Sequence, residues 1–225
     1  IISPQKLKKM GKILAKTLVK NGIFRIITRP FTGKFGKFTR LKGSYVSLAK
    51  RFYPSSVIQK LNQKKINIIT TRHIYSILGK PKGKIKTIDD KMDNDKLLQS
   101  ITNIIEKKTG PSFMIFCLRD FDMFGHYKNH VGYGMKLMEF DHMLKNTIKK
   151  LKEDDLLMIT ADHGCDPTLE IRGHTREYVP IILYTKKGKE KKWLGIRSTF
   201  ADLGQTICYN FSTKPIKLGK YFDFF

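Results

Sequence analysis

Leu156-Leu157-Met158-Ile159-Thr160-Ala161-Asp162-His163-Gly164 is the stretch of sequence that decides the fold, because a short apolar segment runs directly into an aspartate, a histidine and a glycine. Short apolar segments bounded by polar residues are typical of buried strands. A second such segment, at 113–118, leads into Arg119-Asp120-Phe121-Asp122. Amphipathic patterns of helical spacing at about 93–107 and 129–151 separate these segments. Apolar strands that alternate with such helices indicate an α/β fold, with a mostly parallel sheet flanked by helices.

Residues of metal-binding type follow both strands. Ligands of parallel sheets bind beyond the carboxyl ends of the strands, so we expect 113–118 and 156–160 to be neighbours in one parallel sheet. Two carboxylates and three imidazoles would then lie on loops at one edge of that sheet. Mixed oxygen and nitrogen donors suit Mn²⁺, Zn²⁺ or Fe²⁺ better than Ca²⁺, and such a site can polarise a phosphoryl oxygen. The candidate ligands are Asp122 or Asp120, His126, Asp162, His163 and His174. Asp-Phe-Asp has the alternative of capping the helix that follows it.

The composition is that of a folded protein with an uneven distribution of charge. The 225 residues are 40% hydrophobic and 28% charged, which excludes a disordered chain, and no apolar run approaches the roughly 18 to 20 residues that cross a bilayer. We therefore expect a soluble, cytoplasmic protein whose three cysteines are reduced. Residues 1–88 hold 22 of the 44 Lys and Arg but none of the 19 Asp and Glu. The positive electrostatic potential of this segment attracts phosphorylated small molecules or polyanions. With 35 Lys to 9 Arg and no nucleic-acid-binding motif, nucleic acid is not favoured.

Two segments carry a resemblance to a known family. Residues 159–168 (Ile-Thr-Ala-Asp-His-Gly-Cys-Asp-Pro-Thr) and 174–180 (His-Thr-Arg-Glu-Tyr-Val-Pro) closely resemble phosphopentomutases, which belong to the alkaline phosphatase superfamily. The resemblance covers essentially the whole chain. Its other elements are Asp120-Phe121-Asp122-Met123, Gly125-His126, Val131-Gly132-Tyr133-Gly134, Arg197 with Phe200–Gly204, and Arg29-Pro30-Phe31-Thr32-Gly33 with Gly36, Phe38 and Arg40. One departure is Cys165, which stands where the family usually has Asn.

The resemblance implies an alkaline phosphatase-like core and an enzyme that interconverts ribose or deoxyribose 1-phosphate and 5-phosphate. Residues 1–80 are similar to part of the family's small α/β cap domain, which binds substrate, and residues 81–225 to the carboxyl-terminal part of its catalytic core. The family implies two Mn²⁺ ions, with Mg²⁺, Zn²⁺ or Co²⁺ as alternatives. The corresponding residues are Asp162 and His163 for one ion, Asp122, His126 and His174 for the other, and Arg29 and Arg40 for the sugar phosphate.

The family's nucleophilic threonine and one further carboxylate ligand lie upstream of anything that matches this chain. We therefore expect a catalytically incomplete chain, whose partners are a pentose phosphate and the missing amino-terminal segment of the same enzyme. Two alternatives stay open. One is another metal-dependent mutase or phosphatase of the superfamily, and the other is a catalytically inactive, basic binding protein, for which the acid-free residues 1–88 are the argument.

Overall fold

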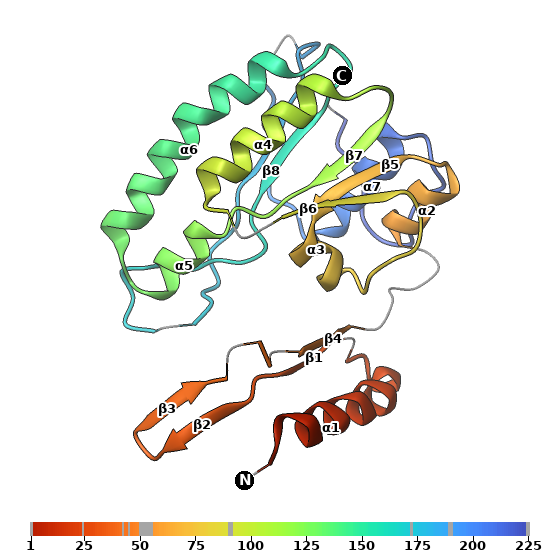
Figure 1. Cartoon of the computed structure of the whole chain (residues 1–225). Helices are drawn as coiled ribbons and strands as arrows, with labels where there is room; N and C mark the ends of the chain where they lie inside the picture. Colours follow the sequence, from red (N-terminus) through yellow and green to blue (C-terminus); the bar gives the residue numbers. More distant parts are fainter. Residues whose placement is uncertain are drawn as a thin grey trace. The chain divides into compact units, whose positions relative to one another are not determined.

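The computed structural model describes residues 2–23, 25–41, 43–44, 46–49, 56–89, 92–171, 173–188 and 191–223. These residues form helices and short strands in an α/β arrangement (Figure 1). The chain divides into two compact units. The first unit comprises Ile1–Ile88, Phe113–Ile115 and Gly204–Gly219, and the second comprises Asp89–Ser112, Phe116–Leu203 and Lys220–Phe225.

The first unit begins with a helix that packs on a two-stranded antiparallel sheet. Its elements are α1 (Pro4–Thr17), a 3₁₀ helix (Leu18–Asn21), β1 (Arg25–Thr28), β2 (Phe31–Lys34), β3 (Lys37–Arg40) and β4 (Val46–Ala49). Ser3 caps α1, because its hydroxyl accepts the amide hydrogen of Lys6 at 3.2 Å. β1 pairs with β4, and Gly11 lets α1 approach them, since a Cβ at Gly11 would lie only 2.8 Å from Cγ2 of Thr28. β2 and β3 form an exposed hairpin.

The first unit also contains a three-stranded sheet. Its elements are α2 (Val57–Gln63), β5 (Asn67–Thr71), α3 (Arg72–Ile77), β6 (Ile85–Ile88), β7 (Ser112–Ile115) and the second half of α7 (Ala201–Asn210). β5 lies between β6 and β7 and is parallel to β6. A hydrophobic core joins Leu61 of α2, Ile68 of β5, Phe113 of β7 and Ile207 of α7. Helices therefore flank this sheet, and burial of its β-branched and aromatic side chains stabilises it.

The second unit is built on two long helices and a strand pair. It contains α4 (Asn94–Lys107), α5 (Asp120–His126), α6 (His130–Lys150), β8 (Leu157–Thr160) and β9 (Ile181–Tyr184). α4 and α6 lie side by side (Figure 1), and the buried hydroxyls of Thr102 and Thr147 share a hydrogen bond of 2.8 Å between them. β8 and β9 are antiparallel, with Thr160 opposite Ile181.

The predicted fold class, an α/β structure with a parallel sheet flanked by helices, is confirmed, but one strand pairing is wrong. β7 pairs with β5, and β8 pairs with β9, so 113–118 and 156–160 are not neighbours in one parallel sheet. The chain between β8 and β9 holds no helix among its described residues. Parallel pairing needs a long crossover, usually a helix, whereas an antiparallel return does not. A further difference is α5, since the segment 120–126 is a helix and not a loop.

The proposed division into a cap at 1–80 and a catalytic core at 81–225 stays a prediction, because the compactness of the two units does not report on substrate binding. None of the described helices is long and apolar enough to cross a membrane.

The second unit contains a buried carboxylate, Asp202, and we therefore expect the free energy of unfolding to depend on pH. Asp202 accepts hydrogen bonds from Nε of Arg197 at 2.6 Å and from the amide of Lys220 at 2.8 Å, and its side chain is only 6% exposed. Burial acts to raise the pKa of Asp202, but the Lys220 amide and the Arg197 guanidinium outweigh it and hold the pKa below its usual range. A lowered pKa stabilises the fold above the unfolded value of about 4, and this contribution disappears as the pH falls through the folded pKa.

Asp202→Asn is therefore expected to lower the free energy of unfolding at pH 7 by about 2 kcal/mol, because a charge-assisted hydrogen bond becomes a neutral one. Urea unfolding at pH 7 and again near pH 3 measures this effect, with exposed Asp141→Asn as the control. The difference between Asp202→Asn and the wild type should shrink at the lower pH. An equal difference at both pH values would contradict an ionised Asp202.

Candidate metal centre

One helix supplies two of the candidate ligands. Asp122 and His126 lie one turn apart on α5, so their side chains project from the same face. Nε2 of His126 is 3.2 Å from Oδ1 of Asp122. Gly125 is the buried residue of this helix, and the side chain of Asp122 is 53% exposed. α5 therefore presents a carboxylate and an imidazole together at an accessible surface.

Two loops after β8 supply the other histidines. The carbonyl oxygen of Gly164 accepts the amide hydrogen of Thr175 at 3.0 Å, and the Thr175 hydroxyl accepts from the Asp166 amide at 2.9 Å. This bridge places His174 directly beside His163. Their rings stack with centroids 3.7 Å apart and an interplanar angle of 17°.

Hydrogen bonding defines which nitrogen of His163 can bind a metal. Nδ1 of His163 lies 3.0 Å from the carbonyl oxygen of Gly164. A carbonyl oxygen only accepts, so Nδ1 carries the hydrogen and a neutral ring keeps its lone pair on Nε2. That nitrogen faces two carboxylates, Oδ1 of Asp122 at 3.5 Å and Oδ2 of Asp162 at 3.8 Å. A neutral Nε2 at this position can bind a cation that the two carboxylates also contact, so the arrangement fits a divalent ion.

The three donors nearest to one another are a carboxylate and two imidazoles. One ligand atom each of Asp122, His163 and His174 lies within 4.8 Å of the others. Two ligands of a single ion, each about 2.0 to 2.3 Å from it, lie up to roughly 4.5 Å apart, so a small adjustment completes the set. Carboxylate oxygen and imidazole nitrogen together suit Mn²⁺ or Zn²⁺. The donor set thus fits the metal that the sequence predicts.

The five predicted ligands all gather in this part of the second unit, but not as two separate groups. Asp122 is close to both His126 and His163, so it lies between the residues predicted for the two ions. His126 also lies near His174, with ring centroids 5.2 Å apart. The side chain of Asp162 is 86% exposed, and its Oδ2 lies 3.8 Å from Nε2 of His163. How the donors divide between ions stays a prediction.

The two predicted phosphate-binding arginines belong to the first unit. Arg29 directly follows β1, and Arg40 ends β3, where it is paired in register with Phe31. Both are in the acid-free part of the chain. Their role towards a sugar phosphate stays a prediction.

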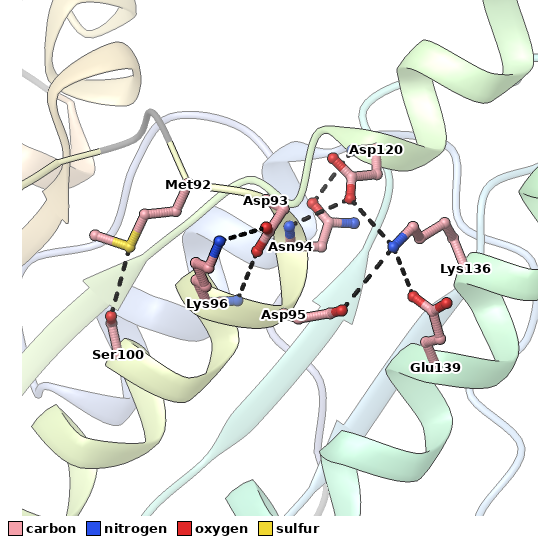
Figure 2. A network of polar contacts seen from close by, with 9 residues as sticks. All are labelled: Met92, Asp93, Asn94, Asp95, Lys96, Ser100, Asp120, Lys136 and Glu139. Atoms are coloured by element: carbon pink, nitrogen blue, oxygen red, sulfur yellow. Dashed lines mark hydrogen bonds and ion pairs between the residues drawn. The ribbon is translucent and has the colours of Figure 1, made fainter.

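Asp120, the alternative to Asp122, takes part in a different network (Figure 2). Its Oδ2 accepts the amide hydrogen of Asn94 at 3.2 Å, and its own amide donates to Oδ1 of Asn94 at 3.2 Å. Nζ of Lys136 lies 3.8 Å from the same carboxylate and 2.6 Å from Glu139, which raises the pKa of Lys136. Asp120 therefore ties the start of α5 to α4 and α6. The geometry favours Asp122 as the ligand.

Sequence reasoning missed the two supporting residues of this network. Asn94 starts α4, 26 residues before Asp120, and Lys136 follows Asp120 by 16 residues on α6. No local pattern joins positions so far apart. Only the packing of α4, α5 and α6 shows that they hold the helix that carries Asp122 and His126.

A cavity of about 950 Å³ adjoins the candidate ligands within the second unit. Asp162 and His163 lie in its lining. The other residues that matter for its chemistry are Thr175, Glu177, Trp193, Arg197 and Phe200. Trp193 is 86% exposed and Phe200 is 56% exposed. The cavity therefore joins candidate metal ligands to an apolar, aromatic surface.

Comparison with known proteins gives matches over most of the chain. Residues 58–215 match the model of the metalloenzyme superfamily. A phosphopentomutase of Clostridium novyi is 37% identical over 206 residues, which are 90% of this chain and 51% of that protein. A phosphopentomutase of Carboxydothermus hydrogenoformans is 37% identical over 217 residues, which are 96% of this chain and 55% of that protein. The chain spans about half the length of the curated relatives it matches.

Proposed function

The chain belongs to the metalloenzyme superfamily, and from this premise we propose that it forms the carboxyl-terminal part of a phosphopentomutase, which interconverts ribose or deoxyribose 1-phosphate and 5-phosphate. The observation that carries the proposal is the cluster of Asp122, His163 and His174, with His126 and Asp162 beside it. The similarity to two phosphopentomutases at 37% identity supports the same reaction.

The cluster holds two divalent ions, Mn²⁺ being the proposed metal, with Mg²⁺, Zn²⁺ or Co²⁺ as alternatives. Asp122, His126 and His174 bind one ion, and Asp162 and His163 bind the other. When bound, such ions polarise a phosphoryl oxygen and neutralise the charge that develops in phosphoryl transfer.

The residues of the chain have separate tasks in this proposal. The Gly164 carbonyl holds His163 in the tautomer that leaves Nε2 free, which lowers the cost of ordering the ring. Arg29 and Arg40, in a cap formed by residues 1–80, bind the phosphate of the sugar, for which a planar guanidinium with several N–H donors is suited. Residues 81–225 provide the carboxyl-terminal part of the catalytic core.

The nucleophilic threonine and a further carboxylate ligand come from an amino-terminal segment of the same enzyme. Without a positioned nucleophile, no enzyme-bound phosphate can form, so the 225 residues alone are not expected to turn over substrate. The partners are that segment and a pentose phosphate, and nucleic acid is not among them. The proposed location is the cytoplasm.

The proposal is tested by joining residues 1–225 to the part of the Clostridium novyi phosphopentomutase that they do not match, which supplies the nucleophile in this proposal. With Mn²⁺ and a sugar bisphosphate activator, the joined protein should convert ribose 1-phosphate but not 3-phosphoglycerate. The separate 225-residue chain is the control and should show negligible turnover.

Other outcomes of this assay identify the alternatives. Preference for phosphoglycerate would assign another mutase of the superfamily. An inactive joined protein, together with salt-sensitive binding of nucleic acid by residues 1–225, would assign a basic binding protein. Robust turnover of ribose 1-phosphate by the separate chain would show that a nucleophile lies within it.

A further inference from the structure

We propose that the contact between Gly125 and Cys165 positions His126 against the loops that carry His163 and His174. The inference rests on the proposed metal centre and assigns two residues that bind no ion themselves. It makes Gly125 and Cys165 positioning residues. Gly125 has no side chain, and the side chain of Cys165 occupies the space that this leaves.

Gly125 is where α5 touches the loop after β8. A Cβ at Gly125 would lie 2.8 Å from Sγ of Cys165, 3.3 Å from its Cβ and 3.4 Å from its carbonyl oxygen. Real Cβ atoms essentially never approach another heavy atom to 2.8 Å, so any larger residue at position 125 must displace the sulfur of Cys165. The absence of a side chain therefore allows the closest approach between the two segments.

Cys165 contacts all three segments that carry ligands. It follows His163 by two residues, its Sγ is 4.0 Å from Nδ1 of His126, and Sγ is 3.9 Å from the carbonyl oxygen of Gly173, which precedes His174. The thiol therefore lies between α5 and the two loops and contacts each of them. A displacement of its sulfur moves His126 relative to both other histidines.

The ring of His126 has a contact at each nitrogen. Nδ1 faces Sγ of Cys165 at 4.0 Å, and Nε2 lies 3.2 Å from Oδ1 of Asp122. Nε2 of His163 lies 3.5 Å from the same carboxylate oxygen. The position of the Cys165 sulfur therefore bears on how the His126 ring is oriented towards Asp122.

A double-mutant cycle on the 225-residue chain tests this inference. Gly125→Ala, Cys165→Ala and the double variant are compared with the wild type by calorimetric titration with Mn²⁺, and thermal unfolding shows that each variant is folded. Gly134→Ala is the matched control, because it is also a helical glycine but a Cβ there meets nothing within 4 Å.

Gly125→Ala is expected to weaken Mn²⁺ binding at least about tenfold, in the range seen when groups that orient metal ligands are removed. In the Cys165→Ala background the same change should weaken binding less than about threefold, because the removed sulfur leaves room for the new methyl group. Gly134→Ala should bind as the wild type does. Cys165→Ala alone should weaken binding a few-fold, through the lost orientation of His126.

Two results would overturn the inference while the metal centre stands. One is wild-type Mn²⁺ affinity in Gly125→Ala. The other is a loss of Mn²⁺ affinity in Gly125→Ala that is equally large in the Cys165→Ala background, with both variants folded. A wild-type chain that binds no Mn²⁺ would instead overturn the proposed metal centre, and this inference with it.

Discussion

Asp122→Asn is expected to lower the affinity of residues 1–225 for Mn²⁺ by at least about 100-fold. Loss of a residue that merely orients a ligand costs about 10- to 100-fold, so loss of a ligand should reach or exceed the upper limit. Asp122 is the one carboxylate of the three-donor set, and it lies within 3.2 and 3.5 Å of two histidine nitrogens. An amide in its place keeps the shape but removes the negative charge that balances the cation.

Asp120→Asn is the matched comparison, because it makes the same chemical change two residues away on α5. Asp120 binds the Asn94 amide and lies near Lys136, so its loss should lower the free energy of unfolding and weaken Mn²⁺ binding by less than about tenfold. Calorimetric titration and urea unfolding of the two variants measure both effects. The reverse order of metal affinities would identify Asp120 as the ligand.

Gly164→Ala is expected to weaken Mn²⁺ binding by about 100-fold, because it separates the loops that carry His163 and His174. A Cβ at Gly164 would lie 2.9 Å from the carbonyl oxygen of Thr175 and 2.5 Å from Oε2 of Glu177. The Glu177 side chain can turn away, but the Thr175 carbonyl is backbone and cannot. The bridge between Gly164 and Thr175 must therefore open, and with it the stacking of the two imidazoles.

Gly173→Ala provides the control for this change. It lies in the second of the same two loops, but the nearest atom to its Cβ would be Cγ2 of Ile171 at an ordinary 3.5 Å. It should bind Mn²⁺ within about threefold of the wild type, since no ligand needs to move. If Gly164→Ala and Gly173→Ala behaved alike in the titration, the bridge would have no part in placing the histidines.

Local sequence patterns predicted the elements of the fold better than their pairing. The helices at 93–107 and 129–151 correspond to α4 and α6, because a long amphipathic repeat is a local property. The pairing of β8 with β9 is not local. The expectation that 113–118 and 156–160 are neighbours came from the metal-type residues that follow both strands, and the strand order does not bear it out. Four-residue strands carry too little information to specify a neighbour.

The candidate site was predictable by residue but not by arrangement. Asp122, His163 and His174 were singled out from their types and positions after strands, and the structure brings them together. The family resemblance assigned Asp122, but residue types and spacing alone left Asp120 open, because the two differ only in which side of a helix they occupy. Until 120–126 is known to be helical, nothing tells which carboxylate faces the histidines.

The strand pair β8 and β9 also affects how this part of the chain can change in evolution. Thr160 lies opposite Ile181, and its hydroxyl donates to the carbonyl oxygen of Pro180 at 2.8 Å, so the intervening residues start and finish at one place. The Gly164–Thr175 bridge joins the two ends of the connecting segment a second time, close to the strands. Length changes between Asp166 and Ile171 fall on the far side of this bridge from His163. Related chains can therefore gain or lose residues there while the distance between the His163 and His174 rings stays the same.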